Sequence, residues 1–179
     1  MRHLAIIVSA ALVSGSALAL DLPTRKAGLW ELKMTFEGRD LPAQVMKQCT
    51  DASTDRLMNM NFGGSNEQAC SKQDVKNSGG TFTIDAVCKF GETTTTSYST
   101  VTGSFDSAYT VKTTSTRSGG PPMPGVAPGA ATHMTIEAKW LGPCKADQRP
   151  GDIVMGNGMK MNINDVQKGL PGLPGGLKK

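Results

Sequence analysis

Three segments of the chain alternate between apolar and polar residues with a period of two. In residues 30–36, Trp30 and every second residue after it are apolar, and glutamate, lysine and threonine lie between them. Residues 82–90 and 134–140 show a similar alternation. This period places the apolar side chains on one face of an extended segment, so each segment predicts a β-strand with one face in a core.

Turn residues predict a second group of elements. Residues 43–49 favour a short strand, and residues 50–60 favour a helical turn capped by Thr50 or Asp51. Gly63-Gly64 is expected to end that helix. Residues 117–131 are rich in glycine and proline, which cannot sustain a regular ladder of hydrogen bonds, and predict a long mobile loop.

A hairpin is predicted where two β-favouring runs, residues 93–102 and 105–116, flank Gly103-Ser104. A type II′ turn at this dipeptide would place residue 102 opposite residue 105. In that register Tyr98 lies opposite Tyr109, and both share one sheet face with Phe105.

Together these elements predict a mainly β fold with one antiparallel curved sheet of about six strands, either a partly closed barrel or a sandwich. A short helix and a disordered C-terminal tail complete it. We expect three regions: a signal peptide over 1–19, a disulfide-stapled β domain over 20–148, and a flexible tail rich in glycine, proline and methionine over 149–179.

The first residues are typical of an export signal. Met1, Arg2 and His3 are followed by an apolar run over residues 4–13 and by Ala17-Leu18-Ala19, a small-residue cleavage pattern. Cleavage before Leu20 leaves 160 residues with 18 basic and 15 acidic side chains. These charges are scattered, which argues against binding of nucleic acid, and the run is too short for stable insertion in a membrane. We therefore expect a periplasmic or secreted protein.

Four cysteines in an exported chain indicate two disulfides. Spacing alone leaves three pairings open, and we favour Cys70 with Cys88 and Cys49 with Cys144. A three-residue loop over 78–80 would place Cys70 and Cys88 directly opposite each other, whereas a two-residue turn at Gly79-Gly80 would put Lys89 opposite Cys70.

Several short motifs occur in a distinctive order: Ala27-Gly28-Leu29-Trp30-Glu31, the four spaced cysteines, Trp140-Leu141-Gly142-Pro143-Cys144 and Arg149-Pro150-Gly151-Asp152. In this order they resemble domain-of-unknown-function family 3617, a group of small secreted bacterial proteins. The resemblance extends from about Ala27 to Asn164 and implies a periplasmic or secreted setting in a Gram-negative bacterium. It implies no activity, cofactor or site residue.

The sequence does not favour an enzyme. His133 is the one histidine after the cleavage point, and neither GxSxG nor HExxH occurs. A hydrolase would need carboxylates such as Glu31, Asp85 and Glu137 to converge, and each also fits an ordinary outward position on a strand. We predict no catalytic residue, no resident cofactor and an unknown partner.

Two binding functions remain. Thioethers suit copper(I), and the candidates are the methionines Met58, Met60, Met155, Met159 and Met161, for which packing in the core is the simpler interpretation. A non-enzymatic binding or scaffold module of the cell envelope is the favoured function, with a small hydrophobic ligand as one candidate. The apolar face that would enclose such a ligand contains the rings of Trp30, Phe36, Phe82, Phe90, Tyr98, Tyr109 and Trp140.

Overall fold

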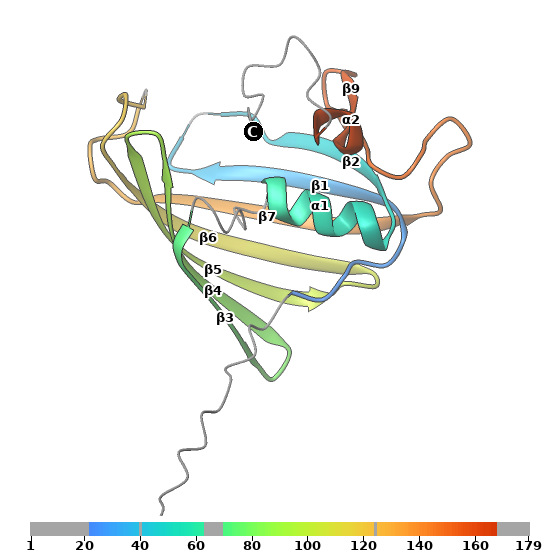
Figure 1. Cartoon of the computed structure of the whole chain (residues 1–179), viewed down its shortest axis with the longest axis horizontal. Coiled ribbons are helices and arrows are strands. Elements are labelled where there is room, and N and C mark those ends of the chain that lie inside the picture. The colour runs from blue at the N-terminus through green and yellow to red at the C-terminus, as the bar shows by residue number, and fades with distance from the viewer. Residues whose placement is uncertain (1–21, 40, 63–69, 124, 168–179) are drawn as a thin grey trace, which may run out of the picture.

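The computed structural model describes residues 22–39, 41–62, 70–123 and 125–167. Within them the chain forms one antiparallel sheet and two helices (Figure 1). The strands are β1 (Gly28–Glu37), β2 (Gln44–Thr50), β3 (Cys70–Ser78), β4 (Thr81–Phe90), β5 (Thr93–Ser104), β6 (Ala108–Ser118), β7 (Thr132–Gly142), β8 (Asp152–Met155) and β9 (Lys160–Asn162). The helices are α1 (Ala52–Phe62) and α2 (Ile163–Gln167).

The sheet is curved and open. Its order is β3-β4-β5-β6-β7-β1-β2-β8-β9, so β3 and β9 are the two edges. This confirms the predicted mainly β fold with a single antiparallel curved sheet, and the sheet is not closed into a barrel. In the described part of the chain, neither helix is long and apolar enough to cross a membrane.

The sheet contains more strands than the sequence predicts. The segments predicted from their period of two form β1, β4 and β7. The additional strands β8 and β9, followed by α2, lie in the predicted tail. The prediction of a flexible tail is therefore wrong for residues 152–167; residues 168–179 lie outside the described residues, as does the predicted signal peptide.

The β5–β6 hairpin forms with a different register from the predicted one. Ser104 pairs with Ala108, so the loop consists of residues 105–107 and not of Gly103-Ser104. Tyr98 lies opposite Thr114, while Tyr109 lies opposite Gly103. The prediction that the two tyrosines face each other is wrong. The observed pairing is shifted from the predicted one by an odd number of residues, and such a shift places the two side chains on opposite faces of the sheet.

The β3–β4 hairpin has a two-residue turn, Gly79-Gly80, with Ser78 opposite Thr81. The predicted three-residue loop is therefore wrong. Cys70 nevertheless lies opposite Cys88, because the register shifts between Cys70 and Lys72. The structure contains the disulfides Cys70–Cys88 and Cys49–Cys144, the pairing that the sequence favours.

Helix α1 lies against one face of the sheet, which we call the inner face (Figure 1). Asp51 caps the helix, since its Oδ1 atom accepts a hydrogen bond of 2.9 Å from the Thr54 backbone N–H. The predicted stop at Gly63-Gly64 lies outside the described residues. Met58 of α1 packs with Ile153 and Ile163 in a buried cluster, which fixes the helix over the β2–β8 side of the sheet.

Candidate functional site

The inner face is recognisable along β6, where exposure alternates strictly from Val111 to Ser118. Lys112, Thr114 and Thr116 are exposed and point outward. The side chains between them are half-buried and belong to the inner face: Tyr109, Val111, Thr113, Ser115 and Arg117. Because β6 is central in the sheet, this series describes how the chemistry of the inner face changes from one end to the other.

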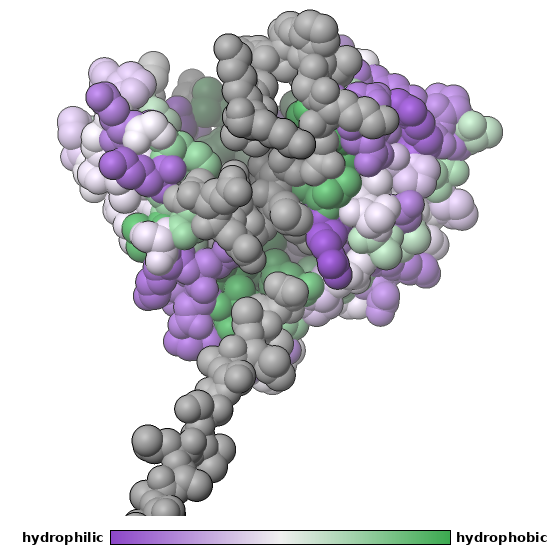
Figure 2. All heavy atoms as spheres, viewed as in Figure 1, coloured by the Kyte–Doolittle hydropathy of each residue, from purple (hydrophilic) through white to green (hydrophobic). Residues whose placement is uncertain are grey.

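A row of apolar side chains runs across five neighbouring strands and includes Val111 on β6. Cross-strand pairing places Val111 beside Val101 on β5 and beside Ile136 on β7. The row continues to Phe82 on β4 and to Met34 on β1. Directly opposite residues on neighbouring strands share a face, so these side chains form a continuous apolar surface. Figure 2 shows apolar residues toward the middle of this face and hydrophilic residues around its margin.

The next row is mixed in character. From β3 to β1, its members lie directly opposite one another on successive strands: Val75, Ile84, Ser99, Thr113, Met134 and Phe36. The hydroxyl groups of Ser99 and Thr113 bond to each other at 2.9 Å. The two hydroxyl groups thus satisfy each other. The remaining side chains of the row are aliphatic, except for the thioether of Met134 and the ring of Phe36.

Aromatic rings border the apolar surface on the side opposite the mixed row. The ring of Trp30, which is fully buried, lies 5.6 Å from that of Tyr109. Tyr109 stacks on Phe105 at 4.9 Å, and Phe105 meets the edge of Phe82 at 5.8 Å. Burial raises the pKa of Tyr109, an effect that the charge of Arg25 only partly offsets, so its phenol stays protonated at neutral pH.

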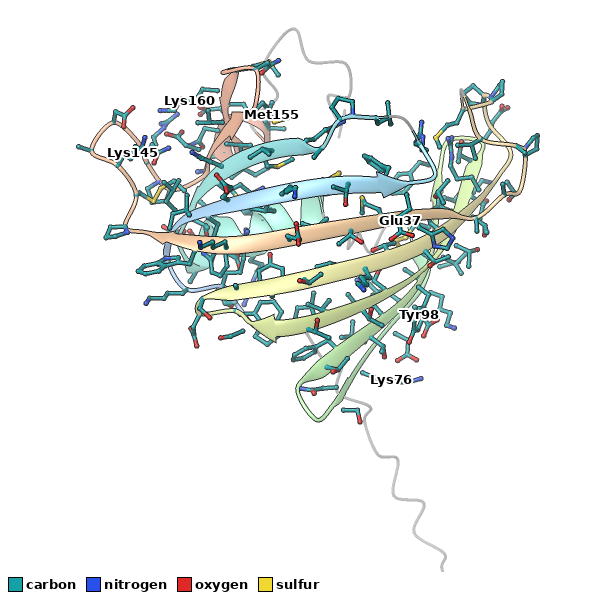
Figure 3. All side chains as sticks on the ribbon, turned by 180° about the vertical axis from the view of Figure 1, so that it is seen from behind. Glu37, Lys76, Tyr98, Lys145, Met155 and Lys160 are labelled. Carbon is teal, nitrogen blue, oxygen red and sulfur yellow. A yellow bond between two sulfur atoms is a disulfide. The ribbon has the colours of Figure 1, made fainter. Side chains whose placement is uncertain are left out.

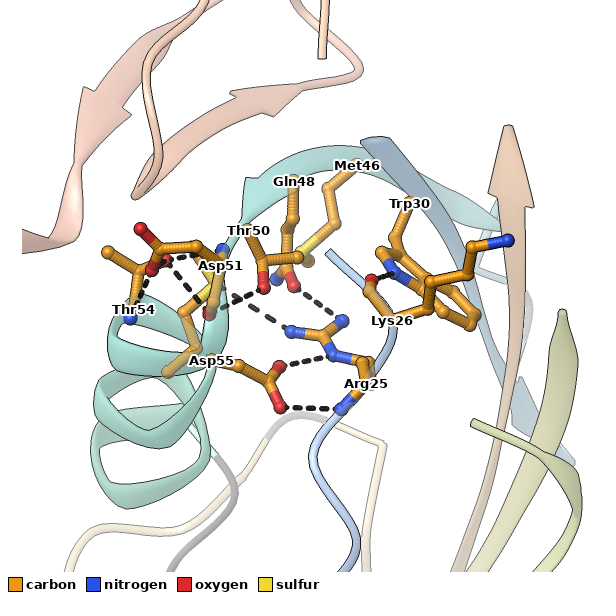
Figure 4. A network of polar contacts seen from close by, with 10 residues as sticks. Arg25, Lys26, Trp30, Met46, Gln48, Thr50, Asp51, Thr54 and Asp55 are labelled. Carbon is orange, nitrogen blue, oxygen red and sulfur yellow. Dashed lines mark hydrogen bonds and ion pairs between the residues drawn. The ribbon is translucent and has the colours of Figure 1, made fainter. Parts of the chain in front are cut away.

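A buried ion pair lies beside this aromatic end (Figure 4). The Nε atom of Arg25 donates to Oδ1 of Asp55 at 2.5 Å, and its backbone N–H donates to Oδ2 at 2.9 Å. Its Nη1 atom donates to Gln48 at 2.9 Å, and its guanidinium lies 5.8 Å from the centre of the Trp30 ring. The pair joins α1 to the segment before β1 and neutralises both charges at this end of the inner face.

The sequence prediction of the apolar face is correct for only part of its aromatic rings. Trp30, Phe82 and Tyr109 belong to the connected aromatic group. Tyr98, by contrast, is 47% exposed on the outer face near Lys76 (Figure 3). Phe90, at the end of β4, is 52% exposed, and the ring of Trp140 packs under the Lys26 ammonium at 3.8 Å.

The carboxylates considered for a hydrolase do not converge. Glu31 and Glu137 each form a surface ion pair with a lysine, with Lys47 at 3.6 Å and with Lys33 at 3.5 Å. Asp85 lies on β4, three strands away from Glu137 on β7. A hydrolase built on these three residues is therefore not supported by the structure.

His133, the lone histidine of the expected mature chain, is exposed on β7. Its Nδ1 atom lies 3.1 Å from the Thr114 hydroxyl. It lines an open hollow of about 390 Å³ together with Glu37, Arg39 and Val126. Thr114 lies directly opposite His133 in the sheet and both side chains are exposed, so the contact is that of two ordinary cross-strand neighbours.

The methionines considered for copper are divided between two environments. Met155 and Met161 pack, with Met46, against the cluster of Met58, Ile153 and Ile163. Met159 is 51% exposed, and the side chain of Met60 lies outside the described residues. The sulfur of Met58 accepts a weak hydrogen bond from Arg25 at 3.7 Å. Among the described histidines, cysteines and acidic residues, no group of three could hold a metal ion.

A second open hollow, of about 690 Å³, lies beside β8 and β9. The buried Asp152 carboxylate accepts hydrogen bonds there from Asn162 at 2.8 Å and pairs with Lys160 at 2.9 Å. Burial acts to raise the pKa of Asp152, but the bonds from Asn162, Lys160 and the Arg149 backbone N–H outweigh it and hold that pKa below its ordinary value. Arg149 is paired with Asp165 at 2.6 Å. Asp152, Lys160, Arg149 and Asp165 thus satisfy one another's charges beside this hollow.

A family model described as "Protein of unknown function (DUF3617)" matches residues 25–144, from Arg25 of the buried ion pair to Cys144 of the long disulfide. No curated protein and no solved structure matches the chain.

Proposed function

The chain belongs to this family of proteins of unknown function, and from the geometry of its inner face we propose that it is a non-enzymatic binding module of the cell envelope. The ligand is a small hydrophobic molecule that lies along the apolar row of Val101, Val111, Ile136 and Met34. No catalytic step is part of this proposal.

The observation that carries the proposal is the difference in burial between two apolar groups. Met58, Ile153 and Ile163 form a core that is at least 98% buried. Along the apolar row, Val101 and Phe82 are also buried, but Val111, Ile136 and Met34 are only half-buried. Each 100 Å² of apolar surface that a ligand removes from water contributes about 2.5 kcal/mol. A half-covered hydrocarbon row therefore provides a driving force that a finished core does not.

The lining also indicates the shape of the ligand. The row consists mainly of aliphatic side chains and thioethers, and its polar neighbours Ser99 and Thr113 bond to each other. Such a surface offers few directional contacts to a polar or aromatic ligand. An extended hydrocarbon chain fits best, with the Trp30–Tyr109–Phe105 rings as the end of its path.

An extracytoplasmic location is the second part of the proposal. Two disulfides and the export pattern of residues 1–19 support it. Fractionation of the native cells, followed by N-terminal sequencing of the protein, tests it. We expect a mature chain that starts at Leu20; full-length chain in the cytoplasm with free thiols would contradict this part of the proposal.

Binding is tested with a neutral fluorescent probe, 1-aminoanthracene, and its displacement by oleyl alcohol. Val111→Asn places an amide in the apolar row, and we expect the affinity for oleyl alcohol to fall about tenfold or more because an amide on this surface loses its hydration. The matched control is Val87→Asn, since Val87 is also a half-buried valine of a central strand but lies on the outer face, opposite Thr96.

The expected result is saturable displacement by oleyl alcohol in the wild type and in Val87→Asn, with weaker binding in Val111→Asn. Equal loss in both variants, or no displacement in the wild type, would refute the proposal. Circular dichroism of each variant establishes that the sheet is intact.

A further inference from the structure

We infer that the ligand is an anionic single-chain lipid whose headgroup binds Arg117 while its tail runs along β6 and ends on the apolar row. This inference rests on the proposed function and adds the class and the direction of the ligand. It is carried by the change in chemistry along β6 and by the state of the Arg117 guanidinium.

The inward side chains of β6 become steadily more polar along the strand. They run from the aromatic Tyr109 and the aliphatic Val111 to the hydroxyl groups of Thr113 and Ser115, and they end at Arg117. From Val111 to Arg117 is six residues, or about 20 Å at about 3.3 Å per residue. That length accommodates an extended acyl chain with its polar end at Arg117.

The polarity at this end is shared by the neighbouring strands. The hydroxyl group of Ser115 lies 2.9 Å from that of Thr132 on β7, and Ser97 pairs with Ser115 from β5. Hydroxyl groups that can act as donors or acceptors suit the polar region next to a headgroup.

Arg117 is the residue that determines the charge of the headgroup. Its guanidinium makes one hydrogen bond, to the Thr93 hydroxyl at 3.4 Å, and has no ion pair with any carboxylate in the parts of the chain that the structure describes. Arg25 and Arg149 both pair with aspartates, at 2.5 and 2.6 Å. A half-buried guanidinium with five donors and one weak acceptor is suited to a carboxylate or phosphate, which it can bind through two parallel hydrogen bonds.

The opposite end of the inner face does not compete for an anion. Arg25 is already neutralised by Asp55 and also donates to Gln48. An additional negative charge there would be buried without a free partner, which is strongly unfavourable. The headgroup is therefore expected at the Arg117 end, and the tail is expected to point toward the aromatic rings.

The experiment compares oleate with oleyl alcohol, which have the same chain and differ in the charge of the head. Affinities are measured by displacement of 1-aminoanthracene at pH 8, for the wild type and for Arg117→Gln, Arg117→Lys and Lys112→Gln. Lys112 is the matched control because it is a cation on the same strand, exposed on the outer face.

We expect Arg117→Gln to weaken oleate about tenfold to a hundredfold, the equivalent of losing hydrogen bonds to a charged group, and to leave oleyl alcohol within about twofold. Arg117→Lys should retain part of the affinity for oleate, and Lys112→Gln all of it. Unchanged binding of oleyl alcohol also shows that the variant is folded.

Two results would overturn the inference while the proposed function stands: equal affinities of the wild type for oleate and oleyl alcohol, or equal losses of oleate affinity in Arg117→Gln and Lys112→Gln. Failure of both ligands to bind the wild type would refute the proposed function as well.

Discussion

The Nε atom of Arg25 lies 2.5 Å from the Oδ1 atom of Asp55, and this contact joins two segments that are 30 residues apart in the chain. The side chains of both residues are at least 96% buried. The pair connects the segment before β1 to α1 and thereby helps to hold the helix on the inner face. The pair also lies at the uncharged end of the ligand path that we propose, opposite the Arg117 end.

Removing one partner of this pair should be costly. Asp55→Asn leaves the Arg25 guanidinium buried without its counter-charge, and we expect a loss of about 3–5 kcal/mol in the free energy of unfolding. Urea denaturation followed by tryptophan fluorescence measures it. Glu137→Gln breaks an exposed pair, with side chains 51% and 60% exposed, and should cost at most about 1 kcal/mol; similar losses in the two variants would contradict the structural role of the buried pair.

The two disulfides should contribute unequally to stability. The Cys49–Cys144 bridge closes a separation of 95 residues and the Cys70–Cys88 bridge one of 18. A model based on chain entropy gives about 5 kcal/mol for the long loop and about 3 kcal/mol for the short one. Unfolding of the double variants Cys49→Ser/Cys144→Ser and Cys70→Ser/Cys88→Ser tests the order. A larger loss from the second variant would show that loop length does not dominate.

Gly28 should not tolerate a side chain. Its φ is 134°, and a Cβ atom would collide with the Gly142 carbonyl oxygen and the Trp140 indole nitrogen, where β1 and β7 approach closely. Gly38 also has a positive φ, 69°, but nothing lies within 4 Å of its Cβ position. We expect Gly38→Ala to cost about 1 kcal/mol through backbone strain alone. Gly28→Ala should lower the melting temperature clearly more, and equal shifts would contradict the close approach.

Acid should destabilise the protein partly through Asp152. The folded-state pKa of this carboxyl is held below its ordinary value of 3.8, so ionisation favours the folded state above that value. This contribution is lost as the pH falls from about 4 through the lower folded-state pKa. In urea titrations between pH 5 and pH 2, Asp152→Asn should show a shallower loss of stability than the wild type. Asp106→Asn, at an exposed turn position, serves as the control, and parallel wild-type and Asp152→Asn curves would contradict the assignment.

Copper(I) should not stabilise the protein. Met46, Met155 and Met161 fill space around the core, and the sulfur of Met58 already accepts a hydrogen bond from Arg25. A thermal unfolding series with increasing copper(I) under reducing conditions is therefore expected to show no change in Tm. A saturable increase that is lost in Met155→Leu would favour a metal site.

Much of the sheet could be predicted because its strands carry strong local signals. The period of two around Trp30, Phe82 and Trp140 is enough to place β1, β4 and β7, since each strand has one buried face. The strands β8 and β9 are only four and three residues long, and glycine and asparagine separate them. β8 pairs with β2 and packs against α1, and β9 pairs with β8; no local pattern reveals these contacts.

Register was less predictable than the strands themselves. The extra residue Ser71 in β3 compensates for the two-residue turn and brings Cys70 opposite Cys88, and no sequence signal marks such a bulge. In the β5–β6 hairpin, glycine at position 103 suggested the turn, but the chain reverses at residues 105–107. Tyr98 and Tyr109 consequently lie on different faces, which changes the lining of the candidate site.

The polar ends of the site could not be predicted from local sequence. Arg25 and Asp55 are 30 residues apart and each has a charged neighbour, Lys26 and Arg56, so only the docking of α1 makes them partners. Arg117 follows a run of threonine and serine that is equally compatible with either face of a strand. The sequence prediction placed Arg117 in the loop over 117–131, but β6 continues to Ser118, so Arg117 shares a face with Tyr109 and Val111.

The most direct test of the account is to locate the ligand on the sheet by methyl NMR. Oleyl alcohol is titrated into protein labelled at valine and isoleucine methyl groups. If a hydrocarbon chain binds to the inner face, saturable shifts are expected for Val101, Val111 and Ile136 on that face, with Val87 on the outer face unchanged. Unchanged inner-face methyl groups, or shifts confined to Val87 and its surroundings, would contradict the claim that the open sheet binds a hydrocarbon chain on its inner face.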